Sequence, residues 1–272
     1  MAIPLDRLLD IFETIAPQNE ADDWDNVGLL LEPTPRAQAQ SIQRILCTID
    51  FGEDILAEAL RLQADLVLSY HPPIFSGLKR LTRKSPGERL VIDALRASIF
   101  VYSPHTALDA APGGVNDWLA EALGPGLCAP IQPSRNPERP AFGMGRRIEL
   151  SQPCPLNTLI SRVKTHLSLP HLRVAASEQH AQGALIQKAA VCAGAGGALL
   201  AKTWGADLYL TGEMRHHDIR EKVAAGASVI LCDHSNSERG YLNVLAGKLK
   251  EMTEGKAEVL LSSLDRDPLS II

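Results

Sequence analysis

The stretches DLVLSYH (65–71) and SVILCDH (228–234) decide the fold, because each is a short apolar run with β-branched residues that ends on a histidine. Three further runs end on, or run just past, a residue able to bind a metal ion: RILCTID (44–50), SIFVYSPH (98–105) and ADLYLTGE (206–213). In an open parallel sheet, ligands bind at the carboxyl ends of the strands, where side chains converge. A single histidine after a strand is commonly structural, but several such endings in one chain predict a metal site.

Helical and strand patterns alternate around these runs in the first 125 residues. Continuous Val, Ile and Leu runs between helices indicate a parallel or mixed sheet that is covered on both faces. The expected elements are helices at 4–15, 53–63, 86–97 and 113–123 and strands at 44–50, 65–70 and 99–103.

Residues 124–145 hold five prolines and four glycines, a composition that predicts a connector. A second alternating block follows, with strands expected at 146–150, 171–177, 207–211, 228–232 and 257–262, another from 186, and helices at 156–167, 214–225 and 236–251. We therefore expect an α/β protein of two α/β lobes with mixed or mostly parallel sheets covered by helices. The first lobe would be 1–125 plus 234–272 and the second 126–233.

Composition excludes several classes of protein. The 272 residues suit two domains, and no apolar stretch reaches the roughly 18 residues of a membrane span. The N-terminus reads as an amphipathic helix with acids, not as a signal peptide, so we expect a cytoplasmic protein. A net charge of −5 argues against nucleic-acid binding. The five cysteines are widely spaced without a CxxC pair, which predicts free thiols and excludes a zinc ribbon or disulfide framework.

SYHPPIF (69–75) places His71 just past a buried strand, and Pro72 and Pro73 make the backbone there rigid. Rigid backbone under an imidazole suits a metal ligand; the alternative is a proline-capped loop with a surface histidine. In SPHTALD (103–109), His105 and Asp109 are four apart, so a helical turn would place them on one face. Alternatively, Asp109 is a turn residue and His105 packs on a strand end.

DHSNSERGYL (233–242) is the most specific segment, because His234 and Glu238 are four apart at the expected start of a helix. The alternative is a capping box in which Ser235 pairs with Glu238. Imidazole and carboxylate together suit zinc, iron or manganese and do not choose among them.

TGEMRHHD (211–218) concentrates Glu213, His216 and His217, with Asp218, over a strand end and a first helical turn. Acids at a helix start also have a simple dipole explanation. CAGAGG (192–197) predicts a tight turn between strand and helix or a weak anion contact, and WDNVGLL (24–30) is explained by packing.

Taken together, WDNVGLL, SYHPPIF, SPHTALD, TGEMRHHD and HSNSERG resemble, in order and spacing, the family known as GTP cyclohydrolase 1 type 2 homologues, or "interacting factor three"-like dinuclear-metal proteins. The resemblance implies a two-lobed α/β fold with two divalent metals in the cleft between lobes, and a homohexamer built as a trimer of dimers. It also implies that the metal ligands are His71, Asp109, His234 and Glu238. Where many members have a His–His pair this chain has Tyr70-His71. Either Tyr70 binds as a phenolate, or the second metal is weaker, or water fills the gap.

Two functional hypotheses follow. The first is a metal-dependent hydrolase of a small polar or nucleotide-like substrate, in which Glu213, His216 and His217 transfer protons or contact the substrate. The second is a non-catalytic metal-binding or interaction scaffold that forms a homo-oligomeric ring. A metal store needs only ligands, so the surplus of titratable groups in TGEMRHHD favours the enzyme. Neither hypothesis needs nucleic acid or a membrane.

Overall fold

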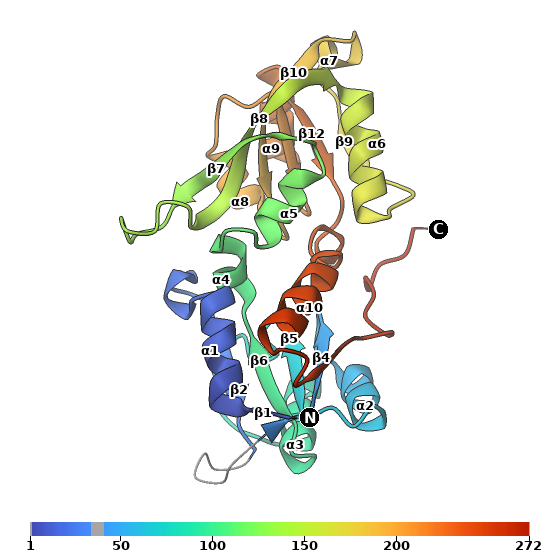
Figure 1. The fold of residues 1–272 in the computed structure, drawn as a ribbon. Coiled ribbons are helices and arrows are strands. Elements are labelled where there is room, and N and C mark those ends of the chain that lie inside the picture. Colours follow the sequence, from blue (N-terminus) through green and yellow to red (C-terminus); the bar gives the residue numbers. More distant parts are fainter. Residues whose placement is uncertain (1, 34–40, 272) are drawn as a thin grey trace. The chain divides into compact units, whose positions relative to one another are not determined.

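The chain divides into two compact units in the computed structural model, which describes residues 2–33 and 41–271. Unit 1 comprises Met1–Leu108 and Tyr241–Ile272, and unit 2 comprises Asp109–Gly240 (Figure 1). The lobe boundaries predicted at 125 and 233 lie inside unit 2, and the division into the lobes 1–125 plus 234–272 and 126–233 stays a prediction. None of the helices in the described ranges is long and apolar enough to cross a membrane.

Unit 1 is built on a five-stranded sheet with the order β13-β4-β5-β6-β2 (Figure 1). The first four strands run parallel and β2 pairs antiparallel with β6, so the mixed, mostly parallel sheet predicted for this part of the chain is confirmed. The strands are β13 (Glu258–Leu261), β4 (Arg44–Thr48), β5 (Leu66–Ser69), β6 (Phe100–Ser103) and β2 (Gly28–Leu31); β1 (Ile3–Pro4) and β3 (Ser41–Ile42) form a separate antiparallel pair.

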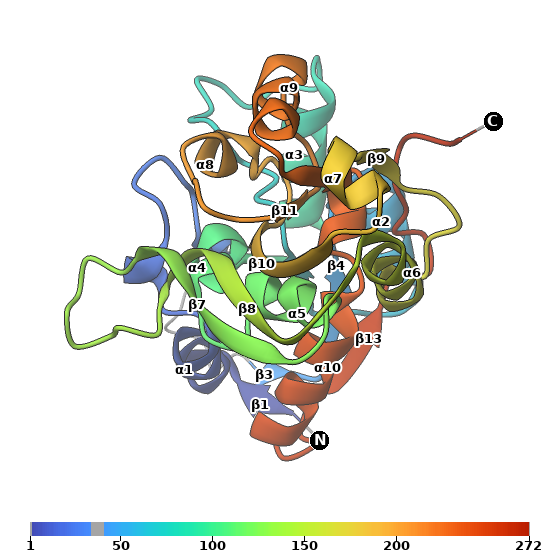
Figure 2. The ribbon, with the colours of Figure 1, turned by 90° about the horizontal axis from the view of Figure 1, so that it is seen from above.

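Helices cover both faces of the unit 1 sheet (Figure 2). On one face, α2 (Glu53–Arg61) and α3 (Pro86–Arg96) pack on Leu46, Val67 and Val101, which are neighbours in register on three adjacent strands. On the other face lie α1 (Leu5–Ile15), whose Phe12 ring is 4.2 Å from that of Tyr102, and α10 (Tyr241–Met252), which packs along β13 and β4. The short elements η1 (Gln18–Glu20) and α4 (His105–Ala110) complete this part of the chain.

Unit 2 contains a six-stranded sheet with the order β7-β8-β10-β11-β12-β9. Its central strands β10, β11 and β12 are parallel and the other pairs are antiparallel. The helices α8 (Gly197–Ala201) and α9 (His216–Ala224) pack on one face against Tyr209 and Val229. The remaining elements are α5 (Val115–Glu121), α6 (Leu156–Leu167), α7 (Glu178–Ala181), β7 (Gly126–Pro133), β8 (Gly143–Pro155), β9 (Arg173–Ala175), β10 (Leu185–Cys192), β11 (Leu208–Thr211) and β12 (Ser228–Leu231).

The connector predicted at 124–145 is wrong over much of its length, because β7 occupies Gly126–Pro133 and pairs antiparallel with β8. Prolines are tolerated in an edge strand, whose outer side forms no ladder, and β7 is the edge of its sheet. Two of the five prolines, Pro130 and Pro133, therefore lie in an edge strand rather than in a linker.

The helix predicted at 236–251 begins later than expected. A 3₁₀ turn, η2, covers Ser235–Ser237, and the α-helix α10 starts only at Tyr241. His234 and Glu238 therefore flank a 3₁₀ turn and do not lie on the first turn of an α-helix.

Candidate metal centre

His71 follows β5 in unit 1 and is held at both its backbone and its ring. Its amide donates to the Ile49 carbonyl at 2.9 Å, and Nδ1 lies 2.9 Å from Oδ1 of Asp50. A carboxylate can only accept, so this bond puts the ring proton on Nδ1 and leaves the lone pair on Nε2. An outer carboxylate on the far nitrogen is the usual partner of a metal-binding histidine.

His105 has a similar carboxylate partner in Asp25. The two side chains meet at 2.7 Å between Nδ1 and Oδ1, and Thr106 donates to the other oxygen of Asp25 through its amide at 3.1 Å and through its hydroxyl. The Asp25 side chain is fully buried. Burial raises the pKa of Asp25, but the bonds from His105 and Thr106 outweigh it, so the pKa lies below its ordinary value of 3.8.

Asp25 is a site residue that sequence reasoning missed, since WDNVGLL was interpreted as packing. Strand β2 follows it and pairs antiparallel with β6, with Gly28 opposite Ser103. This register brings the residues before β2 next to those after β6. A sequence pattern does not give the register, so only the charged residue before the strand could have drawn attention to it.

The aromatic side chains after β5 and β6 lie together in unit 1. Ring centroids are 5.1 Å apart for Tyr70 and His71, 5.6 Å for Tyr70 and His105, and 5.3 Å for His71 and His105. Tyr70 is buried, with 1% of its surface exposed. The strand-end residues thus converge within unit 1, as expected for neighbouring parallel strands.

In unit 2, His234 lies between two carboxylates. Its Nε2 is 3.7 Å from Oε1 of Glu238, and its Nδ1 is 3.5 Å from Oε2 of Glu213. Glu238 is buried at 3% exposure, whereas the side chains of His234 and Glu213 are partly exposed. Asp233, immediately before His234, has a left-handed backbone with φ 66°, a conformation that costs free energy and is often found at functional sites.

The glycine-rich turn after β10 packs directly on this histidine and carboxylate. The Gly194 amide donates to Oγ of Ser237 at 2.7 Å, and that hydroxyl donates to the His234 carbonyl at 2.6 Å. A Cβ on Gly194 would lie 2.5 Å from Oε1 of Glu238 and 3.2 Å from Nε2 of His234. The turn therefore forms a backbone cradle beside His234 and Glu238. CAGAGG predicted a tight turn but not this contact with two predicted ligands.

Asn116 links this cradle to Asp109, and sequence reasoning missed it as well. Its buried side chain donates through Nδ2 to the Asp109 carbonyl at 3.1 Å and accepts through Oδ1 from the Ala193 amide at 2.9 Å. The buried Arg146 donates to the Ala111 carbonyl at 3.1 Å nearby. Asp109 itself is half-buried and lies in α4.

The other residues of TGEMRHHD are more exposed. His216 and His217 open α9 with exposed side chains whose rings are 5.4 Å apart. The amide of Glu213 donates to the Gly194 carbonyl at 3.0 Å. Within unit 2 the structure thus brings Glu213 to His234, while His216 and His217 lie on the surface of α9.

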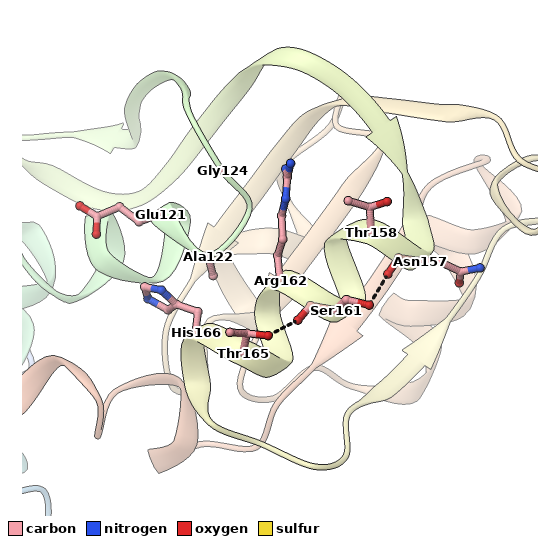
Figure 3. A pocket seen from close by; sticks show the side chains of 9 residues that line it. All are labelled: Glu121, Ala122, Gly124, Asn157, Thr158, Ser161, Arg162, Thr165 and His166. Atoms are coloured by element: carbon pink, nitrogen blue, oxygen red, sulfur yellow. Dashed lines mark hydrogen bonds between the residues drawn. The ribbon is translucent and has the colours of Figure 1, made fainter.

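A separate hollow of about 710 Å³ lies between the end of α5 and one face of α6 (Figure 3). Glu121, Arg162 and His166 are among its lining residues, and the His166 ring packs 4.6 Å from Trp118. Arg162 donates to the Leu123 carbonyl at 2.8 Å, which ties α6 to the end of α5. The predicted site residues are not among those that line this hollow.

Comparison with known proteins identifies the family. The model of the Duf34/NIF3 (NGG1p interacting factor 3) family matches residues 3–268, and the chain belongs to this family. The "Protein NIF3 homolog" of Schizosaccharomyces pombe is 42% identical over 97% of this chain and 96% of its own length. "NIF3-like protein 1" of Bos taurus is 37% identical over 98% of this chain and 92% of its own.

Solved structures with lower sequence identity share the fold. A hypothetical protein of Staphylococcus aureus is 22% identical and superposes with a TM-score of 0.83, covering all of both chains. A Bacillus cereus protein related to NIF3 is 20% identical with a TM-score of 0.82 and covers 99% of each chain. The α/β fold expected from the sequence is confirmed.

Proposed function

We propose that this chain binds divalent metal and uses it to hydrolyse a small polar or nucleotide-like substrate. In the proposal one ion is held by the imidazoles of His71 and His234 and the carboxylate of Glu238, which supply suitable donor atoms. In the proposal Asp109 and Tyr70 serve a second ion. The ions would be zinc, iron or manganese, because two imidazoles and a carboxylate accept all three.

The proposal rests on how each unit orients or buries its own predicted ligands. His71 is oriented by Asp50, with the lone pair on Nε2. Glu238 is a buried carboxylate beside His234, and Gly194 leaves space there that a Cβ would fill. A buried carboxylate is costly unless hydrogen bonds or a cation stabilise its charge, and a divalent ion is the strongest such partner.

A bound divalent ion would supply Lewis-acid chemistry that activates water for hydrolysis. Residues of the chain would orient a ligand and the substrate and would transfer protons. Glu213, whose Oε2 lies 3.5 Å from Nδ1 of His234, would orient that ring, and its 55% exposed side chain is also open to a substrate. His216 and His217, exposed at the start of α9, are the candidates for moving protons.

The test is a hydrolase screen of metal-loaded protein over nucleotides and phosphoesters, with metal content measured in parallel. His216→Ala and His217→Ala should keep the metal and lower turnover, since acid–base groups contribute about 10²–10⁴-fold. Glu221→Gln, an exposed acid on the same helix, is the matched control. Turnover that is equal in all three variants would contradict the proposed roles of His216 and His217. A wild type that binds metal but hydrolyses nothing would favour the scaffold.

The assembly and location belong to the same proposal. It comprises a homohexameric ring in the cytoplasm, with an unknown small molecule as substrate and no nucleic acid or membrane partner. The acidic net charge supports the expected lack of nucleic-acid binding, and the five free cysteines support a reducing compartment. Free thiols are typical of reducing compartments.

A further inference from the structure

Two large aromatic side chains of unit 1 are exposed side by side. Trp24 is 58% and Phe75 is 56% exposed, and their ring centroids are 5.7 Å apart with an interplanar angle of 48°. Exposing a tryptophan forgoes much of the free energy that its burial would contribute. The stability of the folded unit therefore does not explain why these two rings are exposed.

Hydrogen bonds join the two backbone segments that carry the pair. Next to Trp24, the Asp25 amide donates to the Asp22 carbonyl at 3.0 Å, and the Asp25 carboxylate is fixed by His105. Asn26 then donates through Nδ2 to the carbonyl of Ile74, which ties the loop before β2 to the residue that precedes Phe75. Rings held in place before binding lose little conformational entropy when a ligand arrives.

The pair also adjoins His105, whose ring is next to that of the predicted metal ligand His71 in the same unit. The Trp24 ring meets His105 edge-on, with centroids 5.9 Å apart at 77°, and His105 is 5.3 Å from His71. A molecule that rests on Trp24 and Phe75 would thus lie near the carboxyl ends of β5 and β6.

The loop after Phe75 is strongly basic. The segment GLKRLTRK (77–84) contains four basic residues and no acid, and Lys79 and Arg80 are exposed. Arg83 is engaged with Asp93 at 2.7 Å, and Lys79 and Arg80 are the exposed cations that follow Phe75 most closely in the sequence. An anionic group on the ligand complements this loop.

We propose that Trp24 and Phe75 form a stacking site for a planar heteroaromatic ring whose anionic group is bound by Lys79 and Arg80. The ligand class is that of a nucleoside monophosphate, and taking this ligand to be the substrate rests on the proposed function. Aromatic side chains bind a base through its π-face, and lysine and arginine bind phosphate. Binding itself does not need the metal.

The experiment is equilibrium binding of AMP, adenosine and ribose 5-phosphate to the full-length protein after chelator treatment, by calorimetry. AMP should bind saturably and more tightly than either fragment. Trp24→Leu and Phe75→Leu keep an apolar side chain without the ring, and each should raise the AMP dissociation constant about five- to 150-fold. Lys79→Gln with Arg80→Gln should weaken AMP and leave adenosine unchanged.

The controls are Trp204→Leu, which removes another half-exposed tryptophan from unit 2, and Lys202→Gln, which removes an exposed cation. Both should bind AMP like the wild type. AMP binding that is absent at millimolar concentration, or unaffected by Trp24→Leu and Phe75→Leu, overturns the site. So does a change in molar mass of these two variants by light scattering, since the pair would then be a contact between copies. Because the protein is metal-free throughout, the binding result does not depend on whether the metal proposal is correct.

Discussion

His71 and His105 each owe their ring orientation to a carboxylate, but the two carboxylates differ in exposure. Asp25 is fully buried, whereas 60% of the Asp50 side chain is exposed. An exposed ion pair contributes little to stability. Asp50 can therefore be changed with little effect on folding, which makes it the better probe of a metal site.

Asp50→Ala should weaken divalent-metal binding about 10- to 100-fold, because carboxylates behind a ligating histidine typically contribute this much. The thermal midpoint of the metal-free protein should stay close to wild type. Competition titration with a zinc-binding dye measures the affinity, and Asp10→Ala, an exposed acid on α1, is the control. Equal affinity in both variants would mean that His71 does not bind the metal through Nε2.

Gly194→Ala should reduce metal binding more than its strain alone predicts. The new Cβ would meet Oε1 of Glu238 at 2.5 Å, on a left-handed backbone with φ 58°. Gly255→Ala separates the two effects, since Gly255 has φ 69° and a Cβ there would have nothing within 4 Å. Both variants should lose stability, measured by denaturant unfolding, but only Gly194→Ala should lose metal affinity. Similar affinity losses would contradict the cradle.

At the scale of elements, strand–helix alternation was predictable because buried parallel strands are continuous apolar runs. Two segments show why other parts of the fold were not predictable. The prolines of β7 are compatible with an edge strand, but edge position is a property of the sheet and not of the segment. The residues 235–238 leave the α-helix because Ser237 bonds the Gly194 amide, a contact 43 residues distant in sequence. The pair His234 and Glu238 was recognisable, whereas Asp25 and Asn116 depend on long-range contacts.

Helix α2 is joined to the segment after β13 through Glu58. Its buried carboxylate accepts from the Ser263 amide at 3.0 Å and from the hydroxyls of Ser262 and Ser263. Burial raises the pKa of Glu58, but these bonds together outweigh it and leave the pKa below its ordinary value of 4.5. A depressed carboxyl pKa stabilises the fold above the unfolded value, and the stability is lost as pH falls through the folded pKa.

The difference in thermal midpoint between wild type and Glu58→Gln should consequently be greatest above pH 5 and shrink as the pH falls below 4. Glu53→Gln, on the same helix and paired with Arg89 at the surface, should show little difference at any pH. A Glu58→Gln difference that is constant from pH 7 to pH 3 would show that the charge of Glu58 does not matter.

For the molecule as a whole, the oligomeric state is the property that a single chain predicts least well. A ring needs the same surface repeated on each copy, and single-chain features such as exposed Leu127 and Leu185 do not specify its symmetry. If the proposed homohexamer forms, light scattering should give six times the 29.4 kDa of the chain at micromolar concentration. A monomeric mass at that concentration would contradict it.

Elemental analysis of purified protein measures whether His71, His234 and Glu238 bind a divalent ion as proposed. Wild type should carry zinc, iron or manganese after dialysis against metal-free buffer. The double variant His234→Ala with Glu238→Ala should carry essentially none, and His71→Ala should carry much less, while His180→Ala, a buried histidine of unit 2 bonded to Ser228, should keep it. Wild-type metal content in a folded double variant would show that His234 and Glu238 do not bind the ion.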